Sequence, residues 1–436
     1  MKKNVKHVGL ILLFSVAGSF AAENTSACPE GTVVSSISYE GLEHTKSRVV
    51  DRELLNRVGE PFSAEKFEAE KRRLQDLDLF TEIEVSCRPS SSSEFQIPNS
   101  ELVYRFKEIF RWIPSPSSKT TERDGLMLGP AFANLNVLGE DIRAEIQYRT
   151  STKHFLENNE YAFYASSPYL FALPLGWNFE FSHTDSHDDI RDYHDNSWLW
   201  DLDLDYKFLP HLSILGTVVG RSLKNAAFLP EFGAGFAFDF RDSKLDSRKG
   251  FYYEYMLTHV GGTEAYSCEK DCLGSENYWE LLTDARAYFS MWRLVTGATA
   301  LVRYRPGDVK FYDYFSHGGV NSYRGRYGDS ERLGVHETLL NLEERFVLLD
   351  RQPASIAGVN FFYGVQLVAG FDGSLIWNSG HPGWENYEGA VYGGAHLVVP
   401  AIDRIRFEVG YSPDRGEPKY FFGIIEKVST SRWRGR

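Results

Sequence analysis

Arg324 and Asp372 are two charged residues whose side chains are able to form a buried ion pair. Arg324 lies in a long segment without strand pattern, residues 306–334, and Asp372 lies in an alternating segment downstream. A guanidinium and a carboxylate match each other as a bidentate pair, and this contact holds its geometry better than a Lys contact. We therefore expect Arg324 to bind Asp372 and to fix the long segment in place. The alternative is that Arg324 is one of many charged residues on a polar face.

Alternation supports this pairing. Asp372 lies on the polar side of its segment, and Asn341, Glu343 and Arg345 share the polar side of the segment before it. Side chains in a β-strand point to opposite faces with a period of two, so these four residues are expected to face the same space. Glu344 falls on the opposite, apolar side, and the pattern does not explain it. The apolar side of the Asp372 segment is formed by Phe361, Tyr363, Val365, Leu367, Ala369 and Phe371.

Four cysteines predict two disulfides. The spacing favours Cys28 with Cys87 and Cys268 with Cys272, because the members of each pair fall in one predicted segment. Such bonds require an oxidising compartment. A metal site at Cys268 and Cys272 is the alternative, but a second ligand pair of matching spacing is missing.

Residues 182–197, SHTDSHDDIRDYHDNS, place His183, His187 and His194 among five Asp residues. A divalent metal site is one interpretation, and a solvated acidic surface loop is the one that we favour. The sequence contains no G-x-S-x-G elbow and no phosphate-binding loop. We therefore predict a protein that is not an enzyme, with no cofactor and no metal.

The elements that position these residues are alternating strands. In residues 198–208 the even positions are apolar and mostly aromatic, whereas Asp201, Asp203, Asp205 and Lys207 occupy odd positions. The same period recurs in residues 175–181, 232–241 and 404–409, and aromatic residues make up 15% of the chain. A soluble sandwich also alternates, but aromatic faces repeated without covering helices favour a transmembrane barrel. Only closed barrels let strands cross lipid with all backbone groups paired.

The barrel is predicted to occupy residues 110–436. Roughly 20 residues per strand and turn give about sixteen antiparallel strands. The predicted strands begin near residues 110, 125, 140, 159, 175, 196, 211, 231, 250, 276, 293, 335, 361, 386, 403 and 419. The gap at 306–334 follows an odd-numbered strand, so it is predicted to be an outer loop, folded into the lumen.

Two segments precede the barrel. Residues 1–22 combine Lys2, Lys3 and Lys6 with an apolar run, which predicts a signal peptide and a mature chain that starts near Ala22. Residues 28–109 predict a small α+β domain of order β-α-α-β-β, with strands near 33–41, 79–87 and 101–109 and helices near 45–57 and 63–77. The net charge of −13 argues against a nucleic-acid partner.

Three motifs resemble those of the BamA/TamA outer-membrane assembly superfamily. LQDLDLFTEIEV, residues 74–85, is similar to the helix-to-strand signature of a POTRA domain. FSHGGVNSYRGRYGD, residues 315–329, resembles the family's loop-six motif, with Gly318 and Gly319 ahead of the Arg324–Gly325 pair. DFRDSKLDSRKG, residues 239–250, resembles a turn motif. NLEERF, residues 341–346, supplies the N-x-E-x-R pattern of the following strand. The turn-motif residues are Asp239, Arg241, Asp242 and Gly250.

Two positions depart from the family pattern. The aromatic residue expected after the Arg-Gly pair is replaced by Arg326, and Tyr327 follows one place later. In GFDGS, Asp372 is kept, while Gly370 and Ser374 replace its usual neighbours. The loop contact is therefore expected to form with altered packing.

The resemblance implies a protein of the outer membrane of a diderm bacterium that inserts or translocates other proteins. Its partners would be the lipid bilayer, unfolded client proteins and periplasmic accessory proteins, with the POTRA domain in the periplasm. A two-partner-type secretion transporter and a passive pore are the alternatives. Pro114 and Pro116 in the first barrel strand cannot donate to a ladder, so the closure between residues 110–117 and 420–428 is predicted to be weak. Alternatively, the prolines merely end a strand.

Overall fold

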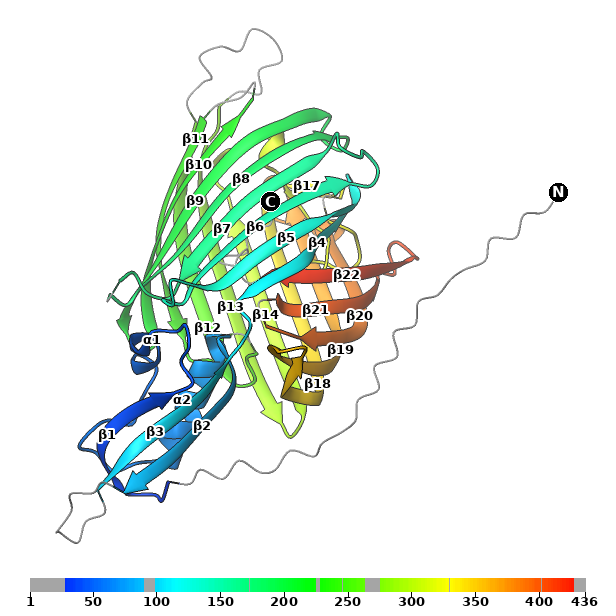
Figure 1. Ribbon diagram of the computed structural model, residues 1–436. Coiled ribbons are helices and arrows are strands. Elements are labelled where there is room, and N and C mark those ends of the chain that lie inside the picture. Colours follow the sequence, from blue (N-terminus) through cyan, green and yellow to red (C-terminus); the bar gives the residue numbers. More distant parts are fainter. Residues whose placement is uncertain are drawn as a thin grey trace.

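The computed structural model describes residues 28–89, 99–171, 173–224, 228–244, 246–262, 275–328, 330–400 and 402–426. It consists of a small α+β domain and a large β-barrel, and the small domain lies at one end of the barrel wall (Figure 1). The predicted signal peptide, residues 1–22, and the cysteines Cys268 and Cys272 lie outside the described residues.

The N-terminal domain has the predicted order. Its elements are β1 (Val33–Glu40), α1 (Ser47–Asp51), α2 (Ala64–Asp76), β2 (Phe80–Pro89) and β3 (Asn99–Glu108). β3 lies in the middle of the sheet, parallel to β1 and antiparallel to β2. Helix α2 begins at Ser63, whose side chain accepts the N–H of Lys66, and buries Phe67 and Leu74 against the sheet. α1 is shorter than the predicted 45–57.

Two contacts consolidate this domain. A disulfide joins Cys28 to Cys87, the pair that the sequence predicted. The buried carboxylate of Glu70 accepts the N–H groups of Leu55 and Asn56 and the hydroxyl of Tyr104 at 2.7 Å. Burial and the Glu70 charge raise the pKa of Tyr104 well above its ordinary value, so that hydroxyl remains a donor. The buried acid is thereby satisfied by four donors, including the amide of Asn56.

Sixteen long strands form the barrel in the part of the chain that the structure describes, as the sequence predicted. They are β4 (Trp112–Thr121), β5 (Gly125–Val137), β6 (Ile142–Ser151), β7 (Asn159–Ser167), β8 (Leu175–Asp188), β9 (Tyr193–Leu209), β10 (Leu212–Leu223), β11 (Phe228–Asp239), β12 (Gly250–Gly261), β13 (Asn277–Met291), β14 (Leu294–Tyr304), β18 (His336–Ile356), β19 (Val359–Trp377), β20 (Tyr387–Val398), β21 (Ile402–Tyr411) and β22 (Pro418–Glu426). Each pairs antiparallel with the next, and β22 lies beside β4 to close the ring (Figure 1).

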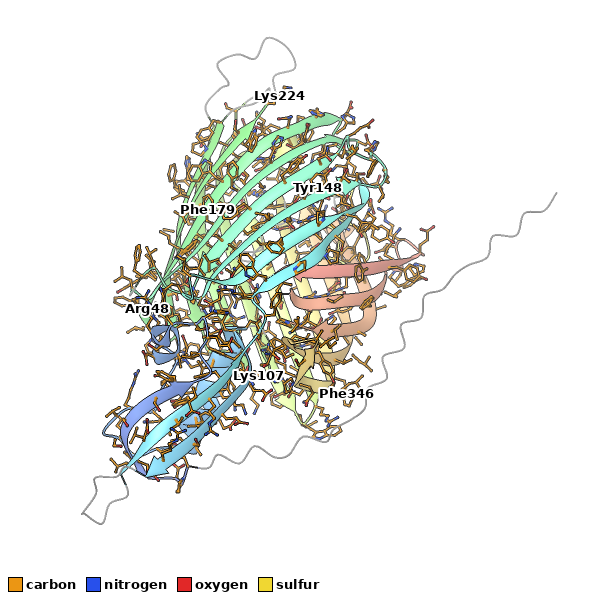
Figure 2. The ribbon with its side chains drawn as sticks, in the orientation of Figure 1. Arg48, Lys107, Tyr148, Phe179, Lys224 and Phe346 are labelled. Atoms are coloured by element: carbon orange, nitrogen blue, oxygen red, sulfur yellow. A yellow bond between two sulfur atoms is a disulfide. The ribbon has the colours of Figure 1, made fainter. Side chains whose placement is uncertain are left out.

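Alternation separates the two faces of the wall. Trp198 and Trp200 on β9 are exposed on the outer face, whereas Asp201 and Asp203 are buried on the lumen side. Figure 2 shows side chains along the barrel wall, with Phe179 labelled on β8. The predicted loop at 182–197 is wrong: β8 and β9 extend through it and leave only residues 189–192 between them. The polar residues there belong to strands, because strands that emerge from lipid at the rim of the barrel are free to carry polar side chains on both faces.

The long connection between β14 and β18 folds back on itself. It contains β15 (Gly307–Asp308), the short helix η1 (Phe311–Asp313) and the two-stranded pair β16 (Phe315–Ser316) and β17 (Leu333–Gly334). Lumen side chains hold it: Arg221 binds Asp313 at 2.9 Å, and buried His317 bonds Glu337 at 2.5 Å. Among the described residues, no helix has the length and apolarity needed to cross a membrane.

The small domain contacts the β5–β6 and β11–β12 turns, which lie at one end of the barrel. Glu140, between β5 and β6, pairs with Lys46 and Arg48. Asp76, at the end of α2, accepts the Ser243 hydroxyl at 2.6 Å, and Ser243 lies between β11 and β12. The domain is therefore held at the barrel mouth by several separate polar contacts.

Candidate functional site

Arg324 is the centre of a buried ion network in the lumen. Its Nη1 donates to both carboxylate oxygens of Asp372, at 2.8 and 2.9 Å, and its backbone N–H donates to Asp372 Oδ2 at 3.0 Å. Its Nε donates to Glu408 Oε2 at 2.5 Å. Arg324 is only 4% exposed, and Asp372 is fully buried. One guanidinium therefore joins the long loop to β19 and β21 at once.

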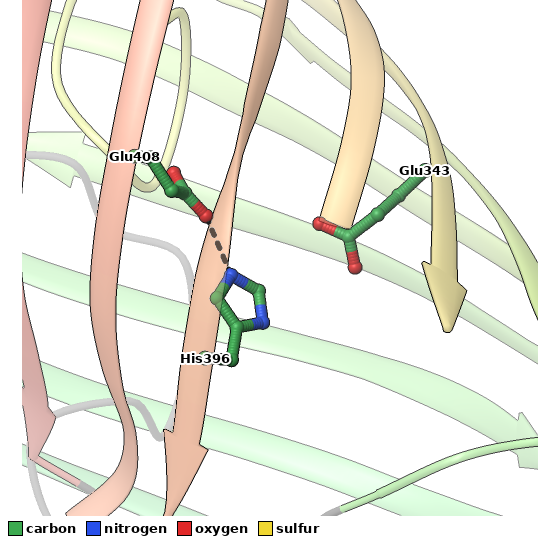
Figure 3. Close-up of side chains that lie close together, drawn as sticks. All are labelled: Glu343, His396 and Glu408. Carbon is green, nitrogen blue, oxygen red and sulfur yellow. Dashed lines mark hydrogen bonds and ion pairs between the residues drawn. The ribbon is translucent and has the colours of Figure 1, made fainter. Parts of the chain in front are cut away.

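The sequence pattern does not identify Glu408 as a partner of Arg324. Its alternation with Phe407 and Val409 places it on the lumen side of β21, which the sequence does show. The local sequence pattern does not identify which lumen carboxylates lie opposite the loop, because β21 is far from the loop in sequence. Glu408 also accepts a hydrogen bond from His396 Nε2 at 2.6 Å, across the β20–β21 ladder (Figure 3).

Glu343, His396 and Glu408 form the one group of potential metal ligands among the described residues, with ligand atoms within 4.8 Å of one another (Figure 3). The donor set does not favour a cation. Glu408 already bonds Arg324, and Arg345 Nε lies 3.5 Å from Glu343. Because two guanidinium groups neutralise these carboxylates, we assign the group to the ion network and not to a metal site.

The predicted network of Asn341, Glu343 and Arg345 divides into two parts. Asn341 donates to Asp372 Oδ1 at 2.7 Å and so supports the Arg324 contact directly. Arg345 instead binds Asp246 Oδ1 at 3.1 Å, in the turn between β11 and β12. Glu343 accepts the hydroxyl of Tyr392, which also holds Asn341, and so lies between the two parts. Glu344, on the outer face, accepts the hydroxyl of Thr296 at 2.8 Å.

The turn motif shapes that turn. Arg241 forms a bidentate pair with Asp239, and Asp242 Oδ1 accepts the backbone N–H groups of Arg248 and Lys249. Gly250 has a φ of +100°, where a Cβ would overlap the carbonyl oxygen of Phe240. These contacts turn the segment inward, which brings Asp246 to the lumen wall. Burial alone would raise the pKa of Asp246, but Arg404, Arg345 and Arg248 hold it well below its ordinary range.

The loop motif positions Arg324 through its backbone. Gly318 has a φ of +154°, and a Cβ there would overlap the carbonyl of Tyr327. The N–H of Gly319 donates to Arg326 O at 2.8 Å and closes the loop across the motif. Gly325 lies against the ring of Tyr323, which leaves no room for a side chain. The glycines thus allow a tight loop that presents Arg324 to the wall.

Arg326, which stands where the family has an aromatic residue, and Tyr327 after it point in different directions. Arg326 forms a bidentate pair with Glu388 on β20, at 2.9 and 2.5 Å. Tyr327 instead reaches β22: its ring lies 5.4 Å from that of Phe421, and its hydroxyl accepts the N–H of Tyr420 at 3.3 Å. The displaced aromatic residue therefore contacts the last barrel strand.

The boundary between β4 and β22, which we call the seam, lacks two backbone donors. The N–H of Leu135 donates to the carbonyl of Arg111, so odd-numbered residues of β4 direct their backbone groups toward β5. Even-numbered residues consequently direct theirs toward β22. Pro114 and Pro116 are even-numbered, and proline has no N–H. Both missing donors therefore belong to the seam.

The tip of the loop bridges the outer end of the seam. The N–H of Glu122, just after β4, donates to Gly328 O at 2.6 Å, and Thr121 forms a parallel bridge with Gly328. Tyr327, the preceding residue, contacts β22 as described above. Two adjacent loop residues therefore join both strands of the seam.

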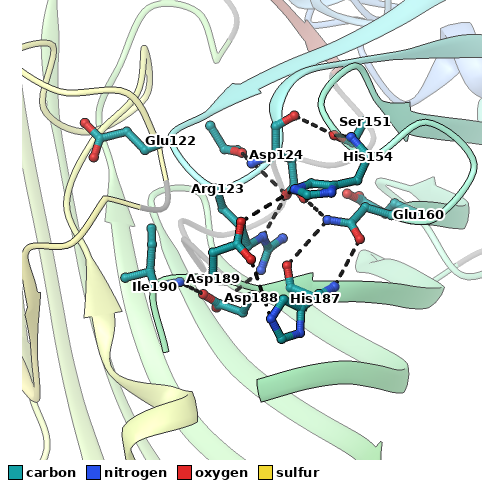
Figure 4. A network of polar contacts seen from close by, with 12 residues as sticks. Glu122, Arg123, Asp124, Ser151, His154, Glu160, His187, Asp188, Asp189 and Ile190 are labelled. Carbon is teal, nitrogen blue, oxygen red and sulfur yellow. Dashed lines mark hydrogen bonds and ion pairs between the residues drawn. The ribbon is translucent and has the colours of Figure 1, made fainter. Parts of the chain in front are cut away.

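The outer turns next to the seam form a polar network (Figure 4). Buried Asp124 accepts the amide of Asn158 at 2.6 Å and binds Arg123 Nε at 2.7 Å. Arg123 reaches Asp188 at 3.5 Å, and Asp188 binds Arg191 at 2.8 Å. The network ties the β4–β5 turn to the turns that follow β6 and β8, so the outer end of β4 is held from the β5 side.

The N-terminal domain and the barrel each match a known protein family. A model of the Omp85 superfamily domain matches residues 136–336, and a POTRA model, described as surface antigen variable number repeat, matches residues 32–108. No curated protein matches the chain.

Two solved structures share the fold. CdiB from Escherichia coli has a TM-score of 0.52 at 15% identity, over 93% of this chain and 91% of that one. CdiB from Acinetobacter baumannii has a TM-score of 0.53 at 12% identity, over 89% of this chain and 73% of that one. With both family models in their expected order, the chain belongs to the Omp85 superfamily and is an outer-membrane β-barrel whose POTRA domain lies in the periplasm.

Proposed function

We propose that this protein assembles or translocates client proteins by opening the seam between β4 and β22 and offering its edges to a client strand. The observation that carries the proposal is the direction of the missing donors. Pro114 and Pro116 both remove N–H groups that would face β22, while the β4–β5 ladder keeps its donors. The boundary most easily separated is thus the one that closes the ring.

A client strand at the opened seam would find partly free edges. On β4 the N–H groups of Trp112, Ser118 and Thr120 face the seam, so they are able to pair with the client strand once the seam is open. The opposite edge belongs to β22, whose ladder with β21 runs from Pro418 to Glu426. Pairing of backbone groups gives affinity without requiring a particular client sequence, which suits handling of many strands.

The loop anchor, by which we mean Arg324, Gly325, Asp372, Glu343 and Arg345, has a positioning role in this proposal. Arg324 is held by Asp372 and Glu408, and Tyr327 lies three residues further along the loop. Because Arg324 is held at the wall, the loop tip that follows it is held beside the seam. The anchor would set how readily the seam opens.

The POTRA domain is proposed to receive clients and accessory proteins in the periplasm. Its sheet order leaves β1 and β2 at the edges, where an extended segment is able to add as a further strand. The domain is bound to the barrel mouth through Glu140 and Asp76, so a captured segment would be close to the barrel.

A two-partner-type secretion transporter is the alternative, and the shared fold of CdiB is compatible with it. A passive pore receives less support, because the loop around Arg324 and the turn around Asp246 both bind lumen side chains. Depletion of the protein followed by outer-membrane proteomics separates these functions. Broad loss of barrels indicates general assembly, loss of one exported protein indicates a dedicated transporter, and an unchanged proteome contradicts both.

Cross-linking tests the seam itself. A series of double variants would combine Ser115→Cys on β4 with cysteine at each position of β22 in turn, and the pair that oxidises quantitatively would be tested. The control combines Ser115→Cys with Ala131→Cys, its register partner on β5. We expect the oxidised seam pair to abolish client assembly, with recovery on reduction, while the control remains active. Full activity of a quantitatively cross-linked seam would refute the mechanism.

A further inference from the structure

The lumen holds a cavity of about 170 Å³ between the loop and the β11–β12 turn. Its walls come from three regions of the chain: the turn, the loop, and strands β13, β14, β18 and β21. The charged residues that line it are Arg241, Lys244, Arg286, Arg324, Arg345, Arg404, Arg406 and Glu343. Seven cations thus face the cavity together with one carboxylate.

Some of these cations have carboxylate partners of their own. Arg241 is paired with Asp239, and Arg324 binds Asp372 and Glu408. Such charges are compensated, so they contribute little attraction for a ligand.

The side of the cavity formed by β18 and β21 is less compensated. Arg345 and Arg404 share one oxygen of Asp246, each at 3.1 Å, and Arg345 also donates to the carbonyl of Ser247 and lies 3.5 Å from Glu343. The Nε atom of Arg406 is buried and forms no hydrogen bond with any part of the protein that the structure describes. The side-chain hydrogen bond of Arg406 goes to the carbonyl of Val320 at 3.4 Å, a neutral partner.

Buried guanidinium groups require anionic partners, because moving an unpaired charge out of water costs on the order of several kcal/mol. The Arg406 guanidinium has more donors than its single contact with Val320 uses, and such a group suits a tetrahedral oxyanion, which accepts several hydrogen bonds at once. Ser322 of the loop lines the same cavity.

We propose that this cavity binds a phosphate- or sulfate-sized oxyanion, with Arg406 as its principal ligand, Lys244 closing it from the turn, and Asn321 and Ser322 lining its loop side. The bound anion joins the loop, the periplasmic turn and the wall. It therefore stabilises the loop inside the lumen. This site is separate from the seam, so its test is independent of client assembly.

The test uses the full chain purified in detergent micelles. Isothermal titration with sodium phosphate measures binding, and thermal unfolding is followed in phosphate and in sodium chloride of equal ionic strength. We expect saturable binding of phosphate and a higher melting temperature in phosphate than in chloride. Equal melting temperatures without saturable binding would overturn the proposal, because general screening raises both equally.

Substitutions of residues that line the cavity test whether phosphate binds there. Arg406→Gln is expected to weaken phosphate binding at least tenfold, and Lys244→Gln several-fold; the latter changes only a turn residue, so it provides the test if Arg406→Gln does not fold. Arg415→Gln, in the outer β21–β22 turn, makes the same kind of change away from the cavity and should bind as the wild type does. Unchanged affinity in the folded cavity variants would also overturn the proposal.

Discussion

The hydroxyl of Tyr327 accepts a hydrogen bond from the backbone N–H of Tyr420 at 3.3 Å, so a residue of the long loop contacts the beginning of the last barrel strand. The next residue, Gly328, accepts the N–H of Glu122 beyond the first barrel strand. A loop that joins the two strands at the point of closure is in a position to control their separation.

Tyr327→Ala is expected to loosen the outer end of the seam, because it removes both the hydrogen bond and the packing on Phe421. Tyr327→Phe should have a smaller effect, since one hydrogen bond contributes about 1 kcal/mol. Distances between spin labels on β4 and β22 measure the effect as a broader distribution. Tyr411→Phe, on the outer face of β21, is the control. An unchanged distribution in Tyr327→Ala would contradict the bridging role.

Replacing the seam prolines should strengthen closure. Pro114→Thr and Pro116→Thr each restore an N–H directed toward β22, at about 0.5–1.5 kcal/mol per hydrogen bond. We expect a more heat-resistant barrel with lower client assembly. Pro130→Thr is the matched control, because Thr152 N–H bonds Leu126 O and even-numbered residues of β5 therefore face β6, away from the seam. Equal effects of all three variants on assembly would count against a special role of the seam.

Removing one partner of the buried ion pair should destabilise the loop. Arg324→Ala leaves Asp372 and Glu408 buried without their cation, a change that costs about 3–5 kcal/mol in comparable pairs. We expect unfolding at lower temperature in heat-modifiability assays and protease cleavage within 315–328. Arg415→Ala breaks an exposed pair with Glu331 and should change stability by less than about 1 kcal/mol. Wild-type protection of the loop in Arg324→Ala would disprove the anchor.

Stability should depend on pH through Asp141, in the β5–β6 turn beside the POTRA domain. Burial raises the pKa of Asp141 to about 7. The unfolded chain ionises this group near pH 4, whereas the folded protein retains the proton until about pH 7. Stability is therefore lost as the pH rises from about 4 to about 7, by up to about 4 kcal/mol.

Asp141→Asn removes this dependence, and Asn tolerates the positive φ of 57° at this position. We expect the variant to unfold at higher temperature than the wild type at pH 8 and at a similar temperature at pH 4. Asp414→Asn, at an exposed outer position, is the control. A variant that is no more stable at pH 8 would show that Asp141 does not carry this penalty.

The sequence alone determined the barrel, its strand number and, in the clearly alternating segments, the face on which each residue lies. Alternation is a local property, because neighbouring side chains of a strand must point to opposite sides of the wall, one in lipid and one in the lumen. It therefore placed Asp372 in the lumen before any contact was known. It failed at 182–197, where strands leave the membrane and their outer face is no longer required to be apolar.

Only the tertiary structure decided which lumen residues meet. Glu408 joins Arg324, and Arg345 turns to Asp246, because closure of the ring brings together strands that are far apart in sequence. The same closure places Tyr327 beside Tyr420. The direction of the missing proline donors depends on the β4–β5 hydrogen-bond parity, which is a property of the paired strands and not of either strand alone.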